Sequence, residues 1–138
     1  MKKEIKLKNQ VEELGRMAQF IEEIGEELGL DMETLMNLNL VMEEMVANVI
    51  FYAYPEGTEG SIELVAEADG KEVTFLLSDQ GREFDPTQKE DPDLEVSPAE
   101  RDIGGMGIYM VKNIMDYVAY QRQDGRNLLT MKKAIHHS

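Results

Sequence analysis

The sequence of 138 residues contains no cysteine, which excludes disulfide bonds, thiol nucleophiles and thiolate metal ligands. Basic residues are scarce, since 14 lysines and arginines stand against 28 aspartates and glutamates, for a formal net charge of -14. Nucleic-acid phosphates are bound by clusters of basic side chains, and the sequence has no such stripe, so we expect no direct nucleic-acid binding. No apolar run resembles a signal peptide or a membrane span, so we expect a cytoplasmic protein that does not bind a membrane.

Hydrophobic residues make up 42% of the sequence, enough to predict one folded domain over residues 1–138, without repeats or linkers. Apolar spacing and turn signals predict helices at 11–28, at 32–53 and after the glycines at 104–107, and strands at 3–8, 61–68, 72–78, 117–121 and 127–133. Residues 79–103 form a long connection, and a connection of this length is usually either a functional lid or a disordered segment. This order predicts an α+β fold, a two-layer sandwich in which a mixed, mostly antiparallel sheet carries its helices on one face.

Cap and turn residues set the boundaries of these elements. Gly29 is expected to end the first helix, and Asp31 is expected to be the N-cap of the second. The pairs 69–70 and 124–125 are both Asp-Gly, which is a strong signal for a two-residue hairpin turn.

Three glycines, Gly104, Gly105 and Gly107, stand directly before an apolar stretch with helical spacing. A glycine cluster at the start of a helix presents free backbone N–H groups at the positive end of the helix dipole, where a phosphate binds well. Taken alone, the same pattern also fits a flexible loop before an ordinary core helix.

The second helix carries polar residues at helical spacing beside an apolar stripe. Asn37, Glu44 and Asn48 are separated by seven and four positions, which places them on one line of the helix surface. The carboxylate could accept a proton from a nucleophile, and the amide oxygen could serve a magnesium ion. A solvated helix face is the alternative interpretation.

A third polar signal follows the strand at residues 72–78. Asp79 stands at the end of the strand, with Gly81 two residues later. An aspartate in this position is often only part of a turn. It could also hold one buried acceptor against the exocyclic amine of a base, with Gly81 letting the ligand lie close to the backbone.

The three signals occur together as Glu44-x-x-x-Asn48, Asp79-x-Gly81-x-x-Phe84 followed by Asp-Pro, and Gly105-Met106-Gly107. In this order and at these separations they resemble the asparagine box and the two glycine boxes of the GHKL ATPases, whose fold gyrase, mismatch-repair ATPases and sensor histidine kinases share. The resemblance covers residues 8–132. The Phe-Asp-Pro variant and the small size are most similar to the anti-sigma-factor serine/threonine kinases.

The resemblance implies a role for each matching residue. Glu44 would be the general base toward a substrate hydroxyl, Asn48 would bind magnesium and nucleotide, and Asp79 would accept a hydrogen bond from adenine, with Gly81 and Phe84 beside it. The glycine box would hold the phosphates of ATP through Gly104, Gly105, Met106 and Gly107, with Arg101 as the nearby basic residue. The sequence departs from the family pattern at Glu83, where many members have a second glycine, and at Tyr52, where a histidine is frequent.

The resemblance implies an ATP- and Mg²⁺-dependent serine/threonine kinase that acts in transcription regulation. The kinase would phosphorylate an anti-sigma-factor antagonist of the STAS type, or sequester a sigma factor. The resemblance is also compatible with a homodimer. The ten methionines of the chain include exposed ones that would suit a surface for more than one partner, although most should be in the core. The alternative is a non-catalytic ATP-binding interaction module of the same fold. A sensor histidine kinase is disfavoured because the only histidines are His136 and His137, and a purely structural interaction protein would use the glycines only as loop residues.

Overall fold

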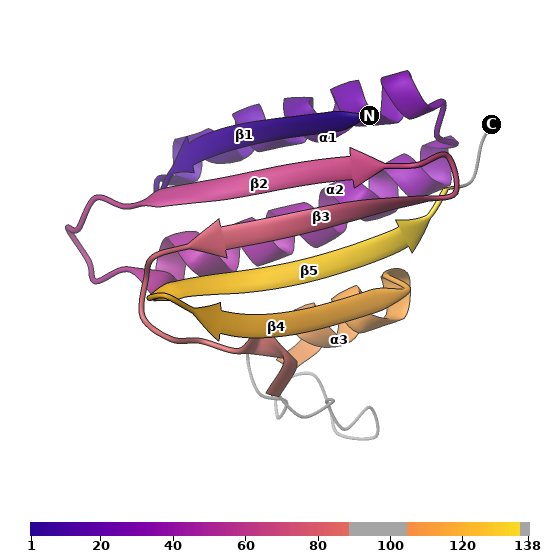
Figure 1. Ribbon diagram of the computed structural model, residues 1–138. Coiled ribbons are helices and arrows are strands. Elements are labelled where there is room, and N and C mark those ends of the chain that lie inside the picture. The colour runs from indigo at the N-terminus through magenta and orange to yellow at the C-terminus, as the bar shows by residue number, and fades with distance from the viewer. Residues whose placement is uncertain (89–104, 136–138) are drawn as a thin grey trace.

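The computed structural model describes residues 1–88 and 105–135. Along the chain the elements are β1 (Lys2–Lys8), the 3-10 turn η1 (Val11–Glu13), α1 (Leu14–Leu28), α2 (Met32–Asn48), the π-helical turn η2 (Val49–Ala53), β2 (Ser61–Ala68), β3 (Glu72–Asp79), the 3-10 turn η3 (Pro86–Gln88), α3 (Gly105–Ile114), β4 (Tyr117–Gln123) and β5 (Arg126–Ala134). This is the order that the sequence predicts, and Figure 1 shows how the elements are arranged. The helix expected to reach Ala53 does so, but its last turn is π-helical.

The junction between α1 and α2 follows from its cap residues. Gly29 takes the left-handed conformation, with φ of 65°, and ends α1. The side chain of Asp31 accepts a hydrogen bond from the backbone N–H of Thr34 at 2.8 Å, so it is the N-cap that the sequence predicts. Leu30 lies between them and is buried in the core.

The five strands form one sheet in the order β1-β2-β3-β5-β4. The sequence predicts a mixed, mostly antiparallel sheet, and all four strand pairings between described residues are antiparallel. Short turns account for two of these pairings, β2 with β3 and β4 with β5, because antiparallel strands are the ones that such turns can join. The turn between β4 and β5 has positive φ at both Asp124 and Gly125, at 52° and 76°.

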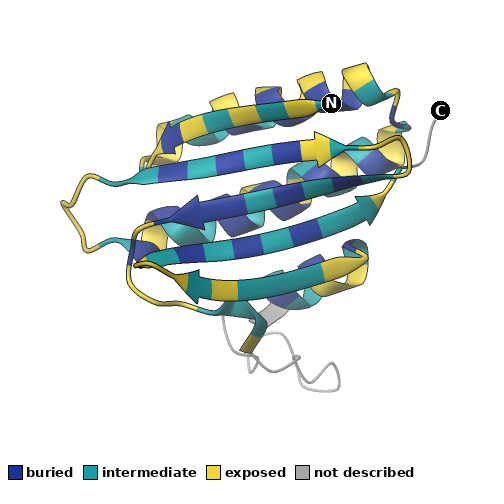
Figure 2. Cartoon of the chain, in the orientation of Figure 1, coloured by how far each residue is buried: buried dark blue, intermediate teal, exposed yellow. Residues whose placement is uncertain are grey.

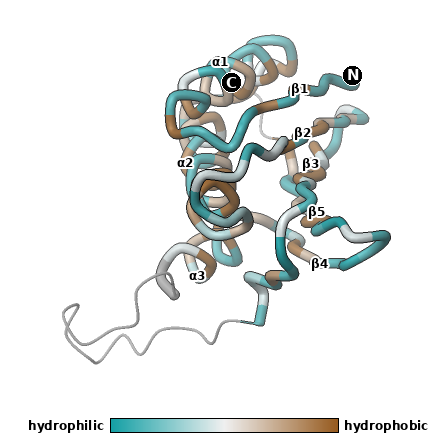
Figure 3. The backbone as a smooth tube through the Cα atoms, turned by 90° about the vertical axis from the view of Figure 1, so that its left-hand side faces the viewer, coloured by the Kyte–Doolittle hydropathy of each residue, from teal (hydrophilic) through white to brown (hydrophobic). Residues whose placement is uncertain are grey.

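The helices cover one face of the sheet, as Figure 3 shows, and the core lies between the two layers. Residues on β2, β3 and β5 alternate between buried and less buried positions, which Figure 2 displays as bands along each arrow. Phe75 and Met131 are fully buried at the centre of this core and face each other across β3 and β5. No helix in the described part of the chain is both long and apolar enough to cross a membrane.

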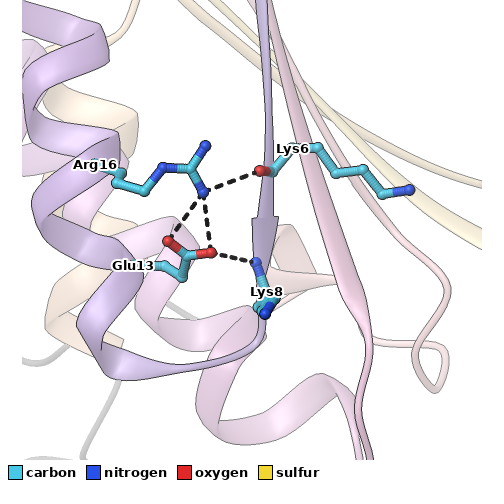
Figure 4. Close-up of polar contacts among 4 residues, drawn as sticks. All are labelled: Lys6, Lys8, Glu13 and Arg16. Atoms are coloured by element: carbon cyan, nitrogen blue, oxygen red, sulfur yellow. Dashed lines mark hydrogen bonds and ion pairs between the residues drawn. The ribbon is translucent and has the colours of Figure 1, made fainter.

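A charged cluster joins β1 to α1 at the edge of the sheet (Figure 4). The carboxylate of Glu13 accepts the backbone N–H of Lys8 at 3.0 Å and both of its oxygens contact Nη1 of Arg16 at 3.0 and 3.1 Å. The Lys8 N–H and then the Arg16 guanidinium lower the pKa of Glu13. The cluster fixes how the chain turns from the first strand into the first helix.

Candidate functional site

One cavity lies between the C-terminal end of α2 and the ends of the central strands. Its lining includes Asn48 from α2, Asp79 from β3 and Phe84 from the following loop, so three residues that are distant in sequence meet there. Two residues that the sequence analysis did not select, Tyr120 of β4 and Asn127 of β5, also line it. The remaining lining residues are apolar: Met45, Val49, Ala53, Leu77, Pro86 and Leu129. An apolar cavity with a few convergent polar groups is the usual form of a small-molecule site.

Asp79 is the central polar group of this cavity, and its residue is only 4% exposed. Its Oδ1 accepts the backbone N–H of Gly81 at 2.8 Å and Nδ2 of Asn127 at 2.9 Å. Both of these hydrogen bonds go to Oδ1, and no described residue donates a hydrogen bond to the second oxygen, Oδ2. The aspartate is therefore held by one oxygen, while the other is available to a donor. A buried carboxylate needs such partners because desolvation of an unpaired charge is costly.

Asn127 organises the hydrogen bonds around Asp79. Its Oδ1 accepts from Tyr120 Oη at 2.5 Å, from Arg122 Nη1 at 3.2 Å and from the backbone N–H of Phe84 at 3.3 Å. Its Nδ2 donates to Asp79 and also to the carbonyl of Arg82 at 2.8 Å. The amide therefore joins β3, β4, β5 and the loop after β3 in one network, and its orientation is fixed from both ends.

The neighbours of Asn127 reinforce this orientation. Burial raises the pKa of Tyr120, so its hydroxyl stays protonated and able to donate. Arg122 Nη1 also donates to the carbonyl of Gly81 at 2.8 Å, which ties the loop after β3 to β4. One feature of the sequence points to Asn127: it continues the inward alternation of Leu129 and Met131 on β5, where a buried polar residue needs a hydrogen-bond partner.

The loop after β3 is attached to the end of α2 through its backbone. Three consecutive N–H groups have defined partners: Gln80 donates to Tyr54 Oη at 2.9 Å, Gly81 to Asp79, and Arg82 to the carbonyl of Ala53 at 2.8 Å. A Cβ at Gly81 would lie 2.4 Å from that Ala53 carbonyl oxygen. Glycine is thus required here because η2 approaches the loop closely. The expected role of Gly81, to let a ligand lie close to the backbone, stays a prediction.

Glu44 and Gly107 meet one helical turn from the cavity. A Cβ on Gly107 would lie 2.1 Å from Oε1 of Glu44, so the half-buried carboxylate lies directly against the backbone of α3. Asn48 follows Glu44 one turn later on α2 and is also half-buried. Two of the sequence signals, the polar line of the second helix and the glycine cluster, are therefore neighbours in space.

The remaining predicted residues lie at or before the start of α3. Gly105 and Met106 form its first turn, which places backbone N–H groups there, because the first N–H groups of a helix have no intrahelical partner. Arg101 and Gly104 lie outside the described residues. Within residues 1–88 and 105–135 no group of three or more His, Cys, Asp or Glu side chains is placed to hold a metal ion.

The fold and the cavity define a class: a two-layer α+β domain with a buried carboxylate at the sheet end and a glycine-led helix beside a carboxylate-bearing helix. Comparison with known proteins identifies the family. The chain belongs to the histidine kinase-like ATPase domain family, whose sequence profile matches residues 7–133. The resemblance stated from the motifs is confirmed.

Several curated proteins are similar to this chain. It is 33% identical to the serine/threonine-protein kinase BtrW of Bordetella bronchiseptica over 94 residues, which are 68% of this chain and 66% of that protein, slightly less than two thirds. It is 23% identical to the serine-protein kinase RsbW of Bacillus subtilis, over 88% of this chain and 79% of the relative. It is 24% identical to the anti-sigma F factor of Clostridium novyi, over 96% of this chain and 93% of the relative.

Solved structures confirm the fold. The RsbU and RsbW domains of Rv1364c from Mycobacterium tuberculosis match with a TM-score of 0.71 and 15% identity, covering 98% of this chain and 32% of that one. The histidine kinase domain of the EL346 blue-light activated histidine kinase from Erythrobacter litoralis matches with a TM-score of 0.56 and 19% identity, covering 88% of this chain and 59% of that one.

Proposed function

We propose that this protein binds ATP with Mg²⁺ and transfers the γ-phosphate to a serine or threonine hydroxyl of an anti-sigma-factor antagonist in the cytoplasm. It would bind a sigma factor as the competing partner and so act in transcription regulation. The observation that carries the proposal is the position of Asp79, which is buried beside Asn48 and fixed through one oxygen by Gly81 and Asn127. The kinase and anti-sigma names of the relatives support the choice of reaction and partners.

Each part of ATP has a matching group in this arrangement. The free oxygen of Asp79 would accept the adenine amine inside the apolar cavity, and the start of α3 would receive the phosphates. The amide oxygen of Asn48 fits Mg²⁺, because this ion prefers oxygen ligands, keeps several waters and shares its remaining positions with phosphates. Bound magnesium would neutralise charge on the phosphates.

Glu44 is the proposed catalytic residue. Its carboxylate would take the proton from the substrate hydroxyl while that oxygen forms a bond to the γ-phosphorus and the bond to the bridging oxygen of ADP breaks. The contact between Glu44 and Gly107 supports this role, because it places the carboxylate at the helix start where the phosphates are expected.

The proposal is tested with purified protein, Mg²⁺, ATP labelled on the γ-phosphate and a panel of STAS-type antagonists from the same organism. We expect label on a serine or threonine of one antagonist. Glu44→Gln should lose the transfer and retain ATP binding, while the control Glu23→Gln, which changes an exposed glutamate on α1, should retain both. Nucleotide binding without transfer to any antagonist would favour the non-catalytic interaction module instead, and absence of ATP binding would contradict the site itself.

A further inference from the structure

The outer face of α2 carries an apolar line that the core does not use. Met32, Met36 and Leu40 are 76%, 64% and 47% exposed, and their spacing of four residues places them on one side of the helix. We refer to these three residues as the methionine stripe. Two other methionines of the same helix, Met42 and Met45, are buried in the core. The helix α2 therefore has two apolar sides, and only one of these sides faces the sheet.

The composition of the stripe suits a protein partner. An apolar line in contact with water is unfavourable unless another surface covers it, and clustered exposure of this kind marks interaction sites. Methionine has a flexible, polarisable side chain that adapts to the shape of a partner. The exposed methionines that the sequence analysis expected are therefore found together, on one helix.

The stripe leads directly to the proposed catalytic carboxylate. Glu44 follows Leu40 by four residues, so it lies one turn further along the same helix and slightly to the side, where it meets Gly107 of α3. A protein that lay along the stripe would bring one end of its contact surface to Glu44. The geometry thus favours the protein that must present a hydroxyl there.

The charges on this face specify the partner further. Glu33 and Glu43 are exposed on the same side of α2, at the two ends of the stripe, and neither forms an ion pair with another described residue. A second copy of this chain, packed antiparallel on the stripe, would bring Glu33 of one copy close to Glu43 of the other. Like charges this close repel, whereas lysine or arginine in these positions would attract.

We propose that the methionine stripe is the docking surface for the hydroxyl-bearing protein substrate, and that it receives a helix whose apolar side chains are flanked by lysine or arginine. The docked helix orients the substrate so that its hydroxyl reaches Glu44. The identity of the occupant as the substrate rests on the proposed kinase function, while the existence of the surface does not.

The test uses a synthetic peptide of about 18 residues, because shorter isolated helices are marginal in water. The peptide carries leucines four residues apart with flanking lysines, and a control peptide carries glutamates in place of the lysines. The whole protein is labelled with ¹³C in its methionine methyl groups, so that the stripe is observed directly by NMR. We expect the basic peptide to shift the signals of Met32 and Met36 and to leave those of the buried Met17 and Met131 in place.

Two variants make the result specific. Met36→Lys should weaken binding of the basic peptide by about tenfold or more. The variant removes apolar contact at the centre of the stripe and adds a positive charge that repels the lysines of the peptide. The matched control is Val11→Lys, which changes another half-exposed apolar residue, in the 3-10 turn before α1. The proposal would be overturned if the basic peptide caused no shift, or if the acidic peptide caused the same shift. It would also be overturned if the shifts depended on protein concentration alone, because the occupant would then be a second copy of the chain.

A parallel titration with Mg-ATP separates this proposal from the kinase function. Met36→Lys lies outside the cavity and should bind Mg-ATP as the parent does. If ATP binds and the peptide does not shift the stripe, the docking surface is refuted and the nucleotide site stands. If the peptide shifts the stripe and ATP does not bind, the surface stands and the kinase function is refuted.

Discussion

Replacing Asn127 by aspartate tests the hydrogen-bond network of the cavity with almost no change in volume. In the parent, Nδ2 of Asn127 donates to Oδ1 of Asp79 at 2.9 Å, and Asp79 is 4% exposed. In Asn127→Asp an acceptor oxygen takes the place of that donor, so two carboxylates face each other in a buried site. We expect the variant to fold less stably at neutral pH and to recover as the pH falls.

The magnitude follows from the distance and the protonation of the pair. Two like charges 2.9 Å apart repel by about 6 kcal/mol at an effective dielectric constant of about 20. The pair avoids this by keeping one proton, which costs about 1.4 kcal/mol for each pH unit above the ordinary aspartate pKa of about 3.9. The loss of stability is therefore about 2 kcal/mol at about pH 5.5 and about 5 kcal/mol at about pH 7.5.

The sign can be checked by linkage. The pKa of the carboxyl pair is raised in the folded variant, so the unfolded state binds fewer protons and stability falls as the pH rises. Urea unfolding of parent and variant at both pH values measures this difference. The control is Asn113→Asp, which removes an exposed donor to the Tyr109 carbonyl and should change stability by only about 0.5 kcal/mol. A loss at pH 7.5 no larger than that at pH 5.5 would refute the reasoning.

Two further predictions concern the other contacts described. Gly107→Ala places a Cβ 2.1 Å from Oε1 of Glu44, so the carboxylate must move. We therefore expect the rate of phosphoryl transfer to fall by about tenfold or more. The thermal unfolding midpoint should stay the same or rise, because alanine favours helix over glycine. Glu13→Gln removes a carboxylate whose pKa is lowered by the Lys8 N–H and by Arg16. The parent should therefore be more stable than the variant above about pH 4.5, and this difference should disappear as the pH falls through the lowered pKa. Urea unfolding of both proteins at several pH values measures the difference.

Local signals made the elements predictable. Gly29, Asp31 and the Asp124-Gly125 turn act through their own backbone and nearest neighbours, and the structure places each as the sequence indicates. The hairpin between β2 and β3 also forms, but within the pair 69–70 only Gly70 has positive φ, and residues 69–71 separate the two strands. The strand order was not predictable in the same way, because the pairing of β3 with β5 joins segments separated by a helix and a long connection. The π-helical turn at Val49–Ala53 was also beyond the sequence, since it depends on how Ala53 meets the loop after β3.

The site was predictable where its residues share one element or one motif. Glu44 and Asn48 follow from helical spacing, and Asp79 follows from its place at the end of a strand. Asn127 was missed because it lies 48 residues from Asp79 and stands close to a hairpin turn, where asparagine is common. Only the register of β3 against β5 brings the two side chains together.

The pair Asp79 and Asn127 occupies the last rung of the ladder between β3 and β5, directly beyond the pairs that fill the core. The alternation that turns Phe75 and Leu77 inward also turns Asp79 inward, so a shift of register by one residue would empty the core and dismantle the cavity together. The pair is the last inward rung of this ladder, so a side chain that replaces Asp79 or Asn127 changes the cavity and leaves the inward pairs of the core in place. Under the proposed function, these two positions would set ligand preference without setting which strands pair.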